Sequence, residues 1–208
     1  MASETARIEA FSDGVFAIAV TLLILEVKIP AVGAPHLRVQ LLQQWPQYVA
    51  FVLSFAFIGI MWINHHRLFN YIRHADNNLL VLNLVLLLGV TIVPFPTAVL
   101  ATRLGTPDQR TAAMLYNGTY VFIAICFNFL WRYSVSRKLL GHDIDYSAAD
   151  KISKQYAFGP ALYLICFLVA WWSVAVSLLM NFALALFFAL PPATAEKLRL
   201  KHSANPRF

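Results

Sequence analysis

Residues 156–190 read YAFGPALYLICFLVAWWSVAVSLLMNFALALFFAL, a stretch of 35 residues without a charged side chain. A single helix of that length would be about 52 Å long, whereas the hydrocarbon core of a bilayer is about 30 Å thick. The stretch is therefore too long for one membrane crossing and long enough for two. We expect two spans joined by a turn near residues 171–173, although no glycine or proline marks that turn.

The composition of the whole chain points to the same class of protein. Of the 208 residues, 60% are hydrophobic and 12% are charged, and the mean hydropathy is +0.65. Soluble domains carry about 25% charged residues. The aromatic content of 14% excludes a disordered chain. Cys126 and Cys166 both lie in apolar runs, which excludes a secreted fold held by disulfides. An all-α integral membrane protein remains.

Four further apolar runs precede residue 156, and each is long enough to cross a bilayer, which takes about 20 residues. We expect six spans at approximately residues 6–30, 46–66, 77–100, 112–133, 153–171 and 173–190. They form a single domain, followed by a basic tail at residues 191–208. The first run is too long for the core of a signal peptide, so we expect it to stay in the mature protein.

The distribution of basic residues predicts the orientation. With six spans and a cytoplasmic N-terminus, four of the 16 Lys and Arg residues lie outside, namely Lys28, Arg38, Arg103 and Arg110. The other 12 lie on the cytoplasmic side, as the positive-inside rule requires. Both termini are therefore expected in the cytoplasm. This topology also explains the net charge of +6 without a nucleic-acid partner.

Motifs of soluble chemistry are absent from the sequence, which has no phosphate-binding loop, nucleophile elbow or paired Cys motif. We therefore expect neither an enzyme nor a bound cofactor. His65 and His66 suggest a metal site, but neighbouring helical residues point about 100° apart and cannot readily share one ion. Interfacial histidines are the favoured interpretation, and no metal site is predicted.

Asparagine side chains are the main polar groups inside the predicted spans. Asn83, Asn128 and Asn181 are expected to form hydrogen bonds from helix to helix, the ordinary use of asparagine in a membrane. Residues 117–119 match a glycosylation sequon, but they lie at the start of the fourth span. We interpret that match as chance.

The first span differs from the others in carrying a stripe of mixed character. At heptad-like spacing this stripe comprises Phe11, Gly14, Ile18, Thr21, Leu25 and Lys28. A face in contact with lipid has no reason to include glycine, threonine and lysine. Small residues allow helices to pack closely, so composition alone favours a packing face over the wall of a pore.

The first span opens with RIEAFSD at residues 7–13 and continues with GVFAIAVTLL at residues 14–23. The first segment fits the signature R-x-x-x-F-S-D, and in this the sequence resembles the first helix of the transmembrane protein 175 family of potassium channels. The second segment is similar to the bacterial form of that helix. Further matches are WINHH at residues 62–66 and PFPT at residues 94–97. The second half of the chain resembles the family only in hydropathy. No internal repeat is present, so the chain resembles the bacterial members, which have one six-helix unit per subunit.

The resemblance implies a homotetramer with four copies of the first helix around a central pore. By position, Ile18 is the narrow hydrophobic point and acts as gate and selectivity element. Thr21 is the hydroxyl-bearing pore position, Leu25 lies further outside, and Leu22 is a neighbouring candidate. K⁺ is the permeant ion, and selectivity over Na⁺ is expected to be modest because an apolar ring does not replace the hydration shell.

The resemblance also implies a polar network at the cytoplasmic end of the first helix. Its members are Arg7, Phe11, Ser12, Asp13, Trp62 and His65, and the sequence does not decide between His65 and His66. The alternative is that Ser12 or Asp13 simply caps the start of the helix. A helix that begins near residues 3–5 would instead place Asp13 inside it, where its carboxylate needs a partner.

The leading interpretation is thus a potassium-permeable channel in a bacterial cell membrane. Its partners are the lipid bilayer and three further copies of itself, with neither nucleic acid nor a small-molecule substrate. The alternative is a proton-conducting or proton-coupled transporter that uses His65, His66 and Asp13. The spans contain no ionisable residue near mid-membrane, which disfavours proton coupling.

Overall fold

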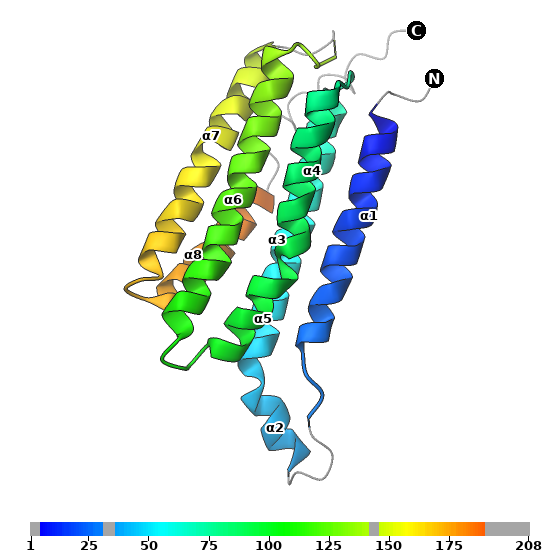
Figure 1. The fold of residues 1–208 in the computed structure, drawn as a ribbon. Coiled ribbons are helices and arrows are strands. Elements are labelled where there is room, and N and C mark those ends of the chain that lie inside the picture. Colours follow the sequence, from blue (N-terminus) through cyan, green and yellow to red (C-terminus); the bar gives the residue numbers. More distant parts are fainter. Residues whose placement is uncertain (1–4, 31–35, 142–145, 190–208) are drawn as a thin grey trace, which may run out of the picture.

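The computed structural model describes residues 5–30, 36–141 and 146–189, which form a bundle of long helices (Figure 1). The helices are α1 (Ala6–Leu22), α2 (Leu37–Gln43), α3 (Trp45–Tyr71), α4 (Asn77–Ile92), α5 (Pro94–Arg103), α6 (Gln109–Ser136), α7 (Tyr146–Val169) and α8 (Val174–Ala189), and α1 continues into the short 3-10 helix η1 (Leu23–Glu26). Within these residues the β structure is limited to an isolated bridge between Ile72 and Leu140. The expected all-α fold is confirmed.

Five segments of the described chain are long and apolar enough to cross a membrane: Ala6–Glu26, Trp45–Tyr71, Asn77–Arg103, Gln109–Ser136 and Ile152–Val169. The sixth expected span corresponds to α8, whose apolar part, Val174–Phe188, is shorter. The 16 residues of α8 make a helix of about 24 Å. The turn between α7 and α8 lies at residues 170–173, where the length of the apolar run predicts it.

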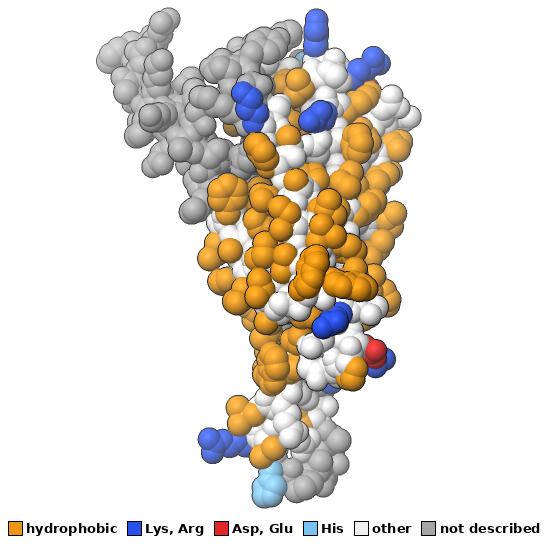
Figure 2. Space-filling model, turned by 90° about the vertical axis from the view of Figure 1, so that its left-hand side faces the viewer, with side chains coloured by type: hydrophobic (Ala, Val, Ile, Leu, Met, Phe, Trp, Pro, Cys, Tyr) orange, Lys and Arg blue, Asp and Glu red, His pale blue; other side chains and the backbone are white. Residues whose placement is uncertain are grey.

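The surface of the bundle is that of a protein in lipid. Figure 2 shows a continuous band of hydrophobic side chains along the middle of one face, with Lys and Arg gathered towards its ends. The large apolar side chains that are exposed on the bundle include Leu84, Phe129, Ile165 and Leu179. Soluble monomers rarely expose apolar patches of this extent.

The third expected span is divided into two helices. We expected one span over approximately residues 77–100, and within it α4 ends at Ile92 and α5 begins at Pro94. Proline lacks the backbone N–H that a helix needs and its ring crowds the preceding turn, so Pro94 and Pro96 together interrupt the ladder. At the break, the Val93 amide donates to the Val90 carbonyl at 3.2 Å, the tighter pattern of a 3-10 turn.

Helix α7 contains Pro160 and nevertheless continues through it. The carbonyl that loses its usual donor is that of Tyr156, four residues earlier. The side-chain amide of Asn128 on α6 donates to this carbonyl at 2.8 Å. A side chain from the neighbouring helix therefore supplies the hydrogen bond that proline removes.

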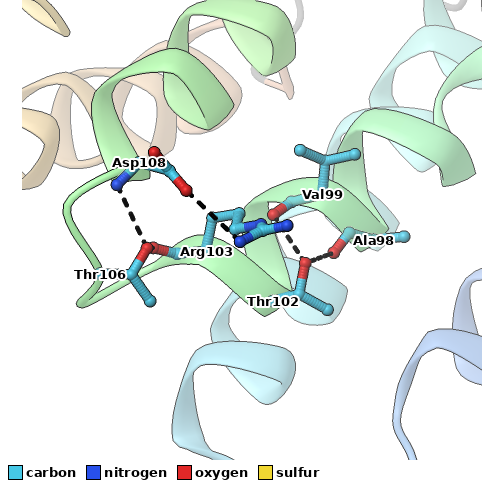
Figure 3. Close-up of polar contacts among 6 residues, drawn as sticks. All are labelled: Ala98, Val99, Thr102, Arg103, Thr106 and Asp108. Atoms are coloured by element: carbon cyan, nitrogen blue, oxygen red, sulfur yellow. Dashed lines mark hydrogen bonds and ion pairs between the residues drawn. The ribbon is translucent and has the colours of Figure 1, made fainter.

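The turn from α5 to α6 is stabilised locally (Figure 3). Gly105 adopts a φ of 82°, in the left-handed region that favours glycine. The hydroxyl of Thr106 donates to the Arg103 carbonyl at 2.7 Å, and the Arg103 guanidinium lies 3.3 Å from the Asp108 carboxylate. The hydroxyl of Thr102 bonds back to its own helix, at 2.9 Å from the Ala98 carbonyl. The ion pair is largely exposed and contributes little to stability.

Helix α2 lies beyond the end of the bundle, opposite the end where the N-terminus lies (Figure 1). It has no buried residue. This short helix therefore does not pack into the helical core.

Candidate functional site

Helix α1 and its extension η1 present two different faces. The buried face consists of Ile8, Ser12, Phe16, Ala19 and Leu23. These residues are three or four positions apart, which places them on one side of a helix, and α1 packs with this side against α3 and α4. The other face is the stripe that the sequence singles out: Phe11, Gly14, Ile18, Thr21, Leu25 and Lys28 are all exposed.

The apolar members of the exposed stripe are uncovered to different degrees. Ile18 is 62% exposed and Leu25 is 64% exposed, whereas Leu22 is 40% exposed. Leu22 is thus less exposed than the other two and lies beside the stripe. Leu25 falls in η1, so the stripe leaves regular α-helical geometry between Thr21 and Leu25.

Thr21 directs its hydroxyl hydrogen back into its own helix. The hydroxyl lies 3.0 Å from the Ala17 carbonyl and 2.9 Å from the Ile18 carbonyl. The hydrogen is therefore engaged within α1, while the lone pairs of the oxygen remain on the exposed side. A hydroxyl in this arrangement offers an acceptor to whatever passes the exposed face.

Behind α1, a buried chain of hydrogen bonds joins three helices. His65 Nε2 on α3 lies 2.9 Å from Asn83 Oδ1 on α4, and Asn83 Nδ2 donates to the Ser12 hydroxyl at 3.0 Å. Ser12 in turn donates to the Ile8 carbonyl at 2.8 Å. Because Asn83 presents its carbonyl oxygen to His65, the histidine must carry its hydrogen on Nε2. His65 is packed between the rings of Phe16 and Phe69.

Two more contacts join α1 to α3 nearer the surface. Trp62 Nε1 donates to the Asp13 carboxylate at 2.9 Å, and His66 Nδ1 lies 2.6 Å from the Glu9 carboxylate. The rings of Trp62 and His66 stack with centroids 6.3 Å apart. Since α1 begins at Ala6, Asp13 lies inside the helix and does not cap it. The two histidines thus have different roles, because His65 joins the buried chain and His66 the surface contact.

The structure brings together four of the six residues expected in the network, namely Ser12, Asp13, Trp62 and His65. Arg7 and Phe11 lie elsewhere: both are exposed, and within the described part of this single chain neither side chain forms a hydrogen bond or an ion pair. Asn83 and Glu9 also take part in these contacts, and the resemblance did not imply either of them. An asparagine within the apolar run of α4 signals a buried partner, but the sequence does not say which one.

A second polar cluster joins α3, α5 and α6, and the sequence did not predict it. The Ser54 hydroxyl on α3 lies 2.8 Å from the Thr97 hydroxyl on α5 and 3.0 Å from that of Tyr116 on α6. Tyr120 donates to Tyr116 at 3.2 Å, and Thr97 donates to the Val93 carbonyl at 2.8 Å. All four hydroxyl groups belong to buried residues. The cluster fastens α5, the helix after the proline break, to α3 and α6.

The three intramembrane asparagines all bond from helix to helix, as predicted. Asn83 links α4 to α1 and α3, and Asn128 links α6 to α7. Asn181 on α8 donates to Asn117 on α6 at 2.6 Å. Asn117 is fully buried, which agrees with the interpretation of the sequon as chance.

Metal-binding groups do not gather in the part of the chain that the structure describes, where no three His, Cys, Asp or Glu side chains cluster. Cys126 and Cys166 are buried and unpaired. The polar groups found here are arranged to hold helices together and to leave one face of α1 uncovered.

These features define a helical membrane protein whose first helix presents a face of mixed composition away from the other helices of the chain. The model of the family described as the endosomal/lysosomal potassium channel TMEM175 matches residues 7–94. A potassium channel from Chamaesiphon minutus is 50% identical over 192 residues, covering 90% of this chain and 95% of the relative. The chain belongs to the TMEM175 family.

Other relatives extend this result. A potassium channel from Streptomyces collinus is 41% identical over 200 residues, covering 93% of this chain and 97% of the relative. The crystal structure of a lysosomal potassium-selective channel TMEM175 homolog from Chamaesiphon minutus matches with a TM-score of 0.82 and 48% identity, over 89% of this chain and 96% of that one. These relatives are ion channels and not enzymes.

The mouse relative is named an endosomal/lysosomal proton channel. It is 33% identical over 135 residues, which cover 60% of this chain and 27% of the mouse protein.

Proposed function

We propose that this protein is a potassium-permeable channel formed by four copies of the chain, with the exposed stripe of α1 lining a central pore. The observation that carries the proposal is that this stripe is uncovered by its own subunit although it contains Gly14, Thr21 and Lys28. Lipid does not favour such a face. One helix cannot enclose a pore, whereas several copies facing one another can.

Ile18 supplies the constriction in this proposal. It is the most exposed apolar residue in the α-helical part of the stripe, and Leu25 follows it two turns later. A ring of four isoleucine side chains offers an ion no substitute for its hydration shell, so a narrow ring closes the pathway by dewetting. K⁺ is less strongly hydrated than Na⁺ and crosses such a ring with a smaller penalty.

Thr21 lies one turn beyond Ile18 and provides the polar element. Its hydrogen bonds to the carbonyls of Ala17 and Ile18 leave the oxygen to face the pathway. Four such oxygens partly replace the water that a K⁺ ion loses at the apolar ring. Leu22 borders the pathway and Leu25 widens it towards the outer side.

The contacts behind α1 set its rotation and therefore which residues line the pore. The chain from His65 through Asn83 to Ser12 and the contact of Trp62 with Asp13 hold the opposite face of α1. Arg7 and Phe11 are exposed at the same end of α1, and we assign them to contacts between subunits. No catalytic residue, cofactor or small-molecule substrate enters this proposal.

The proposed topology has six spans, with α8 as the sixth and both termini in the cytoplasm. The support is the distribution of Lys and Arg, of which 12 of 16 fall on the proposed inner side. The pore domain comprises the six spans, and the basic residues of 191–208 lie at the inner surface of the membrane. Because the relatives include potassium channels of bacteria, we place the protein in a bacterial plasma membrane.

Reconstitution into liposomes tests the function. We expect K⁺ efflux that exceeds Na⁺ efflux, and a reversal potential that follows the K⁺ gradient. Crosslinking of the purified protein in detergent tests the assembly, and we expect bands up to the tetramer. Crosslinking that stops at the dimer would overturn the tetramer, and equal, unsaturable leakage of all ions would overturn the channel.

Proton conduction is the second candidate, favoured by the name of the mouse relative as a proton channel. The sequence of this chain gives less support, because α1 has no titratable side chain between Asp13 and Glu26. The same liposomes distinguish the two functions: a reversal potential that follows the pH gradient and ignores K⁺ would replace the first proposal by the second.

A further inference from the structure

Two charged side chains lie at the outer end of the exposed stripe, and neither belongs to the constriction proposed above. Glu26 is the last residue of η1, and Lys28 follows it at the end of the bundle where α2 lies (Figure 1). The sequence between Asp13 and Glu26 carries no charge. On the proposed pore helix, these two side chains are therefore the first charged groups that an ion entering from outside meets.

The structure holds the Lys28 ammonium group at the end of the stripe. Its Nζ donates to the Leu25 carbonyl at 3.3 Å and lies 3.9 Å from a carboxylate oxygen of Glu26. The backbone N–H of Lys28 donates to Gln47 Oε1 at 2.9 Å, which ties this segment to α3. The Lys28 side chain is 63% exposed, whereas that of Glu26 is 26% exposed. The ammonium group thus lies at the surface, with the carboxylate less exposed beside it.

The charges of this pair matter more for permeation than for folding. An exposed ion pair adds little to stability, because water and salt screen it. In four copies around an axis, however, the Lys28 ammonium groups surround the entrance of a pathway whose wall is largely apolar. Charges of one sign beside a wall of low dielectric constant change the local concentration of ions. Without compensation, such a ring would repel K⁺ from the outer mouth.

We propose that Glu26 neutralises a ring of Lys28 ammonium groups at the outer mouth of the pore, and that this compensation sets the rate at which K⁺ enters from outside. This role depends on the tetrameric channel proposed above. Glu26 does not coordinate the ion, because its carboxylate acts by offsetting the lysine charge. The 3.9 Å between the two groups is shorter than the Debye length of about 8 Å at physiological ionic strength, so dissolved salt does not replace the carboxylate.

Single-channel recording in outside-out patches from cells that express the full-length protein tests this role. At about 0.05 M K⁺ on both sides, Glu26→Gln should lower the inward current by about two- to threefold and change the outward current less. Lys28→Gln should raise the inward current by a similar factor, because it leaves the carboxylates uncompensated. The double variant should return to the current of the unmodified protein. At about 1 M K⁺, where the Debye length is about 3 Å, all these differences should shrink.

Asp108→Asn is the matched control. Asp108 pairs with Arg103 at 3.3 Å at the same end of the bundle, in the turn between α5 and α6 (Figure 3). This turn has no part in the proposed pore, so the substitution removes a carboxylate from an exposed pair and should leave the inward current unchanged.

The recordings separate a failure of this role from a failure of the channel. Normal K⁺ current in the unmodified protein with an unchanged inward current in Glu26→Gln, or an equal loss in Asp108→Asn, would overturn the role of Glu26 alone. If Glu26→Gln does not assemble, Lys28→Gln still decides, because an unchanged inward current there would overturn the charged ring. No K⁺ current in the unmodified protein would overturn the proposed function and this role with it.

Discussion

Helices α1 and α8 both leave one face uncovered in the single chain, but the two faces differ in kind. The exposed positions of α8 are all apolar: Ala175, Val176, Leu179, Phe182, Ala183, Leu186 and Phe187. Those of α1 include Arg7, Gly14 and Thr21 beside Phe11 and Ile18. Exposure in a membrane protein is therefore no guide to function by itself. The composition of the exposed face separates a surface suited to lipid from one that requires water or another subunit.

The buried sides of the two helices also differ. Helix α8 is fixed by neutral groups, as Asn181 bonds Asn117 and Ser177 bonds the Cys166 carbonyl. Helix α1 is fixed by the buried amide and imidazole chain and, nearer the surface, by the carboxylates of Glu9 and Asp13. The contacts of the two carboxylates lie at one end of α1, and in the proposed channel they fix its rotation. We expect mutations to separate these two regions in the following ways.

The largest effect is expected for Ile18→Asn. Four polar side chains would wet one cross-section of the pore, so that single-channel current rises severalfold and the preference for K⁺ over Na⁺ declines. The control is Ile125→Asn, since Ile125 is also exposed, at 37%, but belongs to α6, which has no part in the proposed pore. Single-channel current and reversal potential in K⁺ and Na⁺ measure both. A larger change in the control would show that the wrong surface has been assigned to the pore.

Asn83→Leu and Asn128→Leu test whether the polar contacts behind α1 differ in role from those of the α6–α7 pair. The first leaves the His65 N–H without its partner, and the second leaves the Tyr156 carbonyl without one. Each should cost about 1–3 kcal/mol of stability. Thermal unfolding in detergent measures this loss.

Only Asn83→Leu should also alter conductance, because Asn83 holds the rotation of α1. Equal effects of the two variants on single-channel current would contradict the proposal that Asn83 fixes the rotation of α1.

A smaller effect is expected for Thr21→Ala. The substitution removes the oxygen on the exposed face and keeps the apolar ring at Ile18, so current should remain within about twofold while K⁺ preference falls. Reversal potentials under mixed K⁺ and Na⁺ gradients check this expectation. Thr102→Ala is the matched control, because Thr102 also bonds back to its own helix and lies at the outer end of α5. A loss of current with unchanged selectivity would contradict the assigned role.

The smallest effect concerns pH. The hydrogen bond from the Tyr133 hydroxyl, at 2.7 Å, and that from the Leu79 amide lower the pKa of Asp76 below its usual value. A lowered pKa stabilises the fold above the carboxyl's ordinary pKa of 3.8, and the contribution is lost as the pH falls through the folded value. Asp76→Asn should therefore flatten the decline in melting temperature that accompanies acidification below about pH 4. An unchanged pH profile would contradict the assignment.

Hydropathy predicted the long apolar helices but not where each of them is interrupted. The turn between α7 and α8 followed from length alone, because 35 apolar residues do not fit one crossing. Hydropathy did not predict the break at Val93, because the apolar run continues across it. The two prolines at positions 94 and 96 are the signal in the sequence that indicates this break. Apolarity and helix continuity are separate properties, and only the second depends on the backbone N–H groups.

For the candidate site, the sequence predicted which residues share a face of α1, but not which residues of other helices contact them. Spacing along α1 identified the stripe, because the period of one helix is contained in its own sequence. The hydrogen-bond partners could not be predicted from the sequence. The pairing of Ser12 with Asn83 depends on which helices are neighbours and on how far each is shifted along its axis. The distinction between His65 and His66 likewise required the packing of α3, which buries one ring and exposes the other.

The orientation of the Thr21 hydroxyl has a consequence for the sign of the ions that pass. The hydroxyl hydrogen is bonded to the carbonyls of Ala17 and Ile18. The exposed face of α1 therefore presents the lone pairs of the Thr21 oxygen and not its hydrogen. In a ring of four such groups, chloride would meet only the negative ends of the dipoles, while a cation would meet favourable ones. At the level of Thr21, a preference for cations therefore needs no acidic residue, because the hydrogen bonds to the backbone of α1 fix the orientation of the hydroxyl.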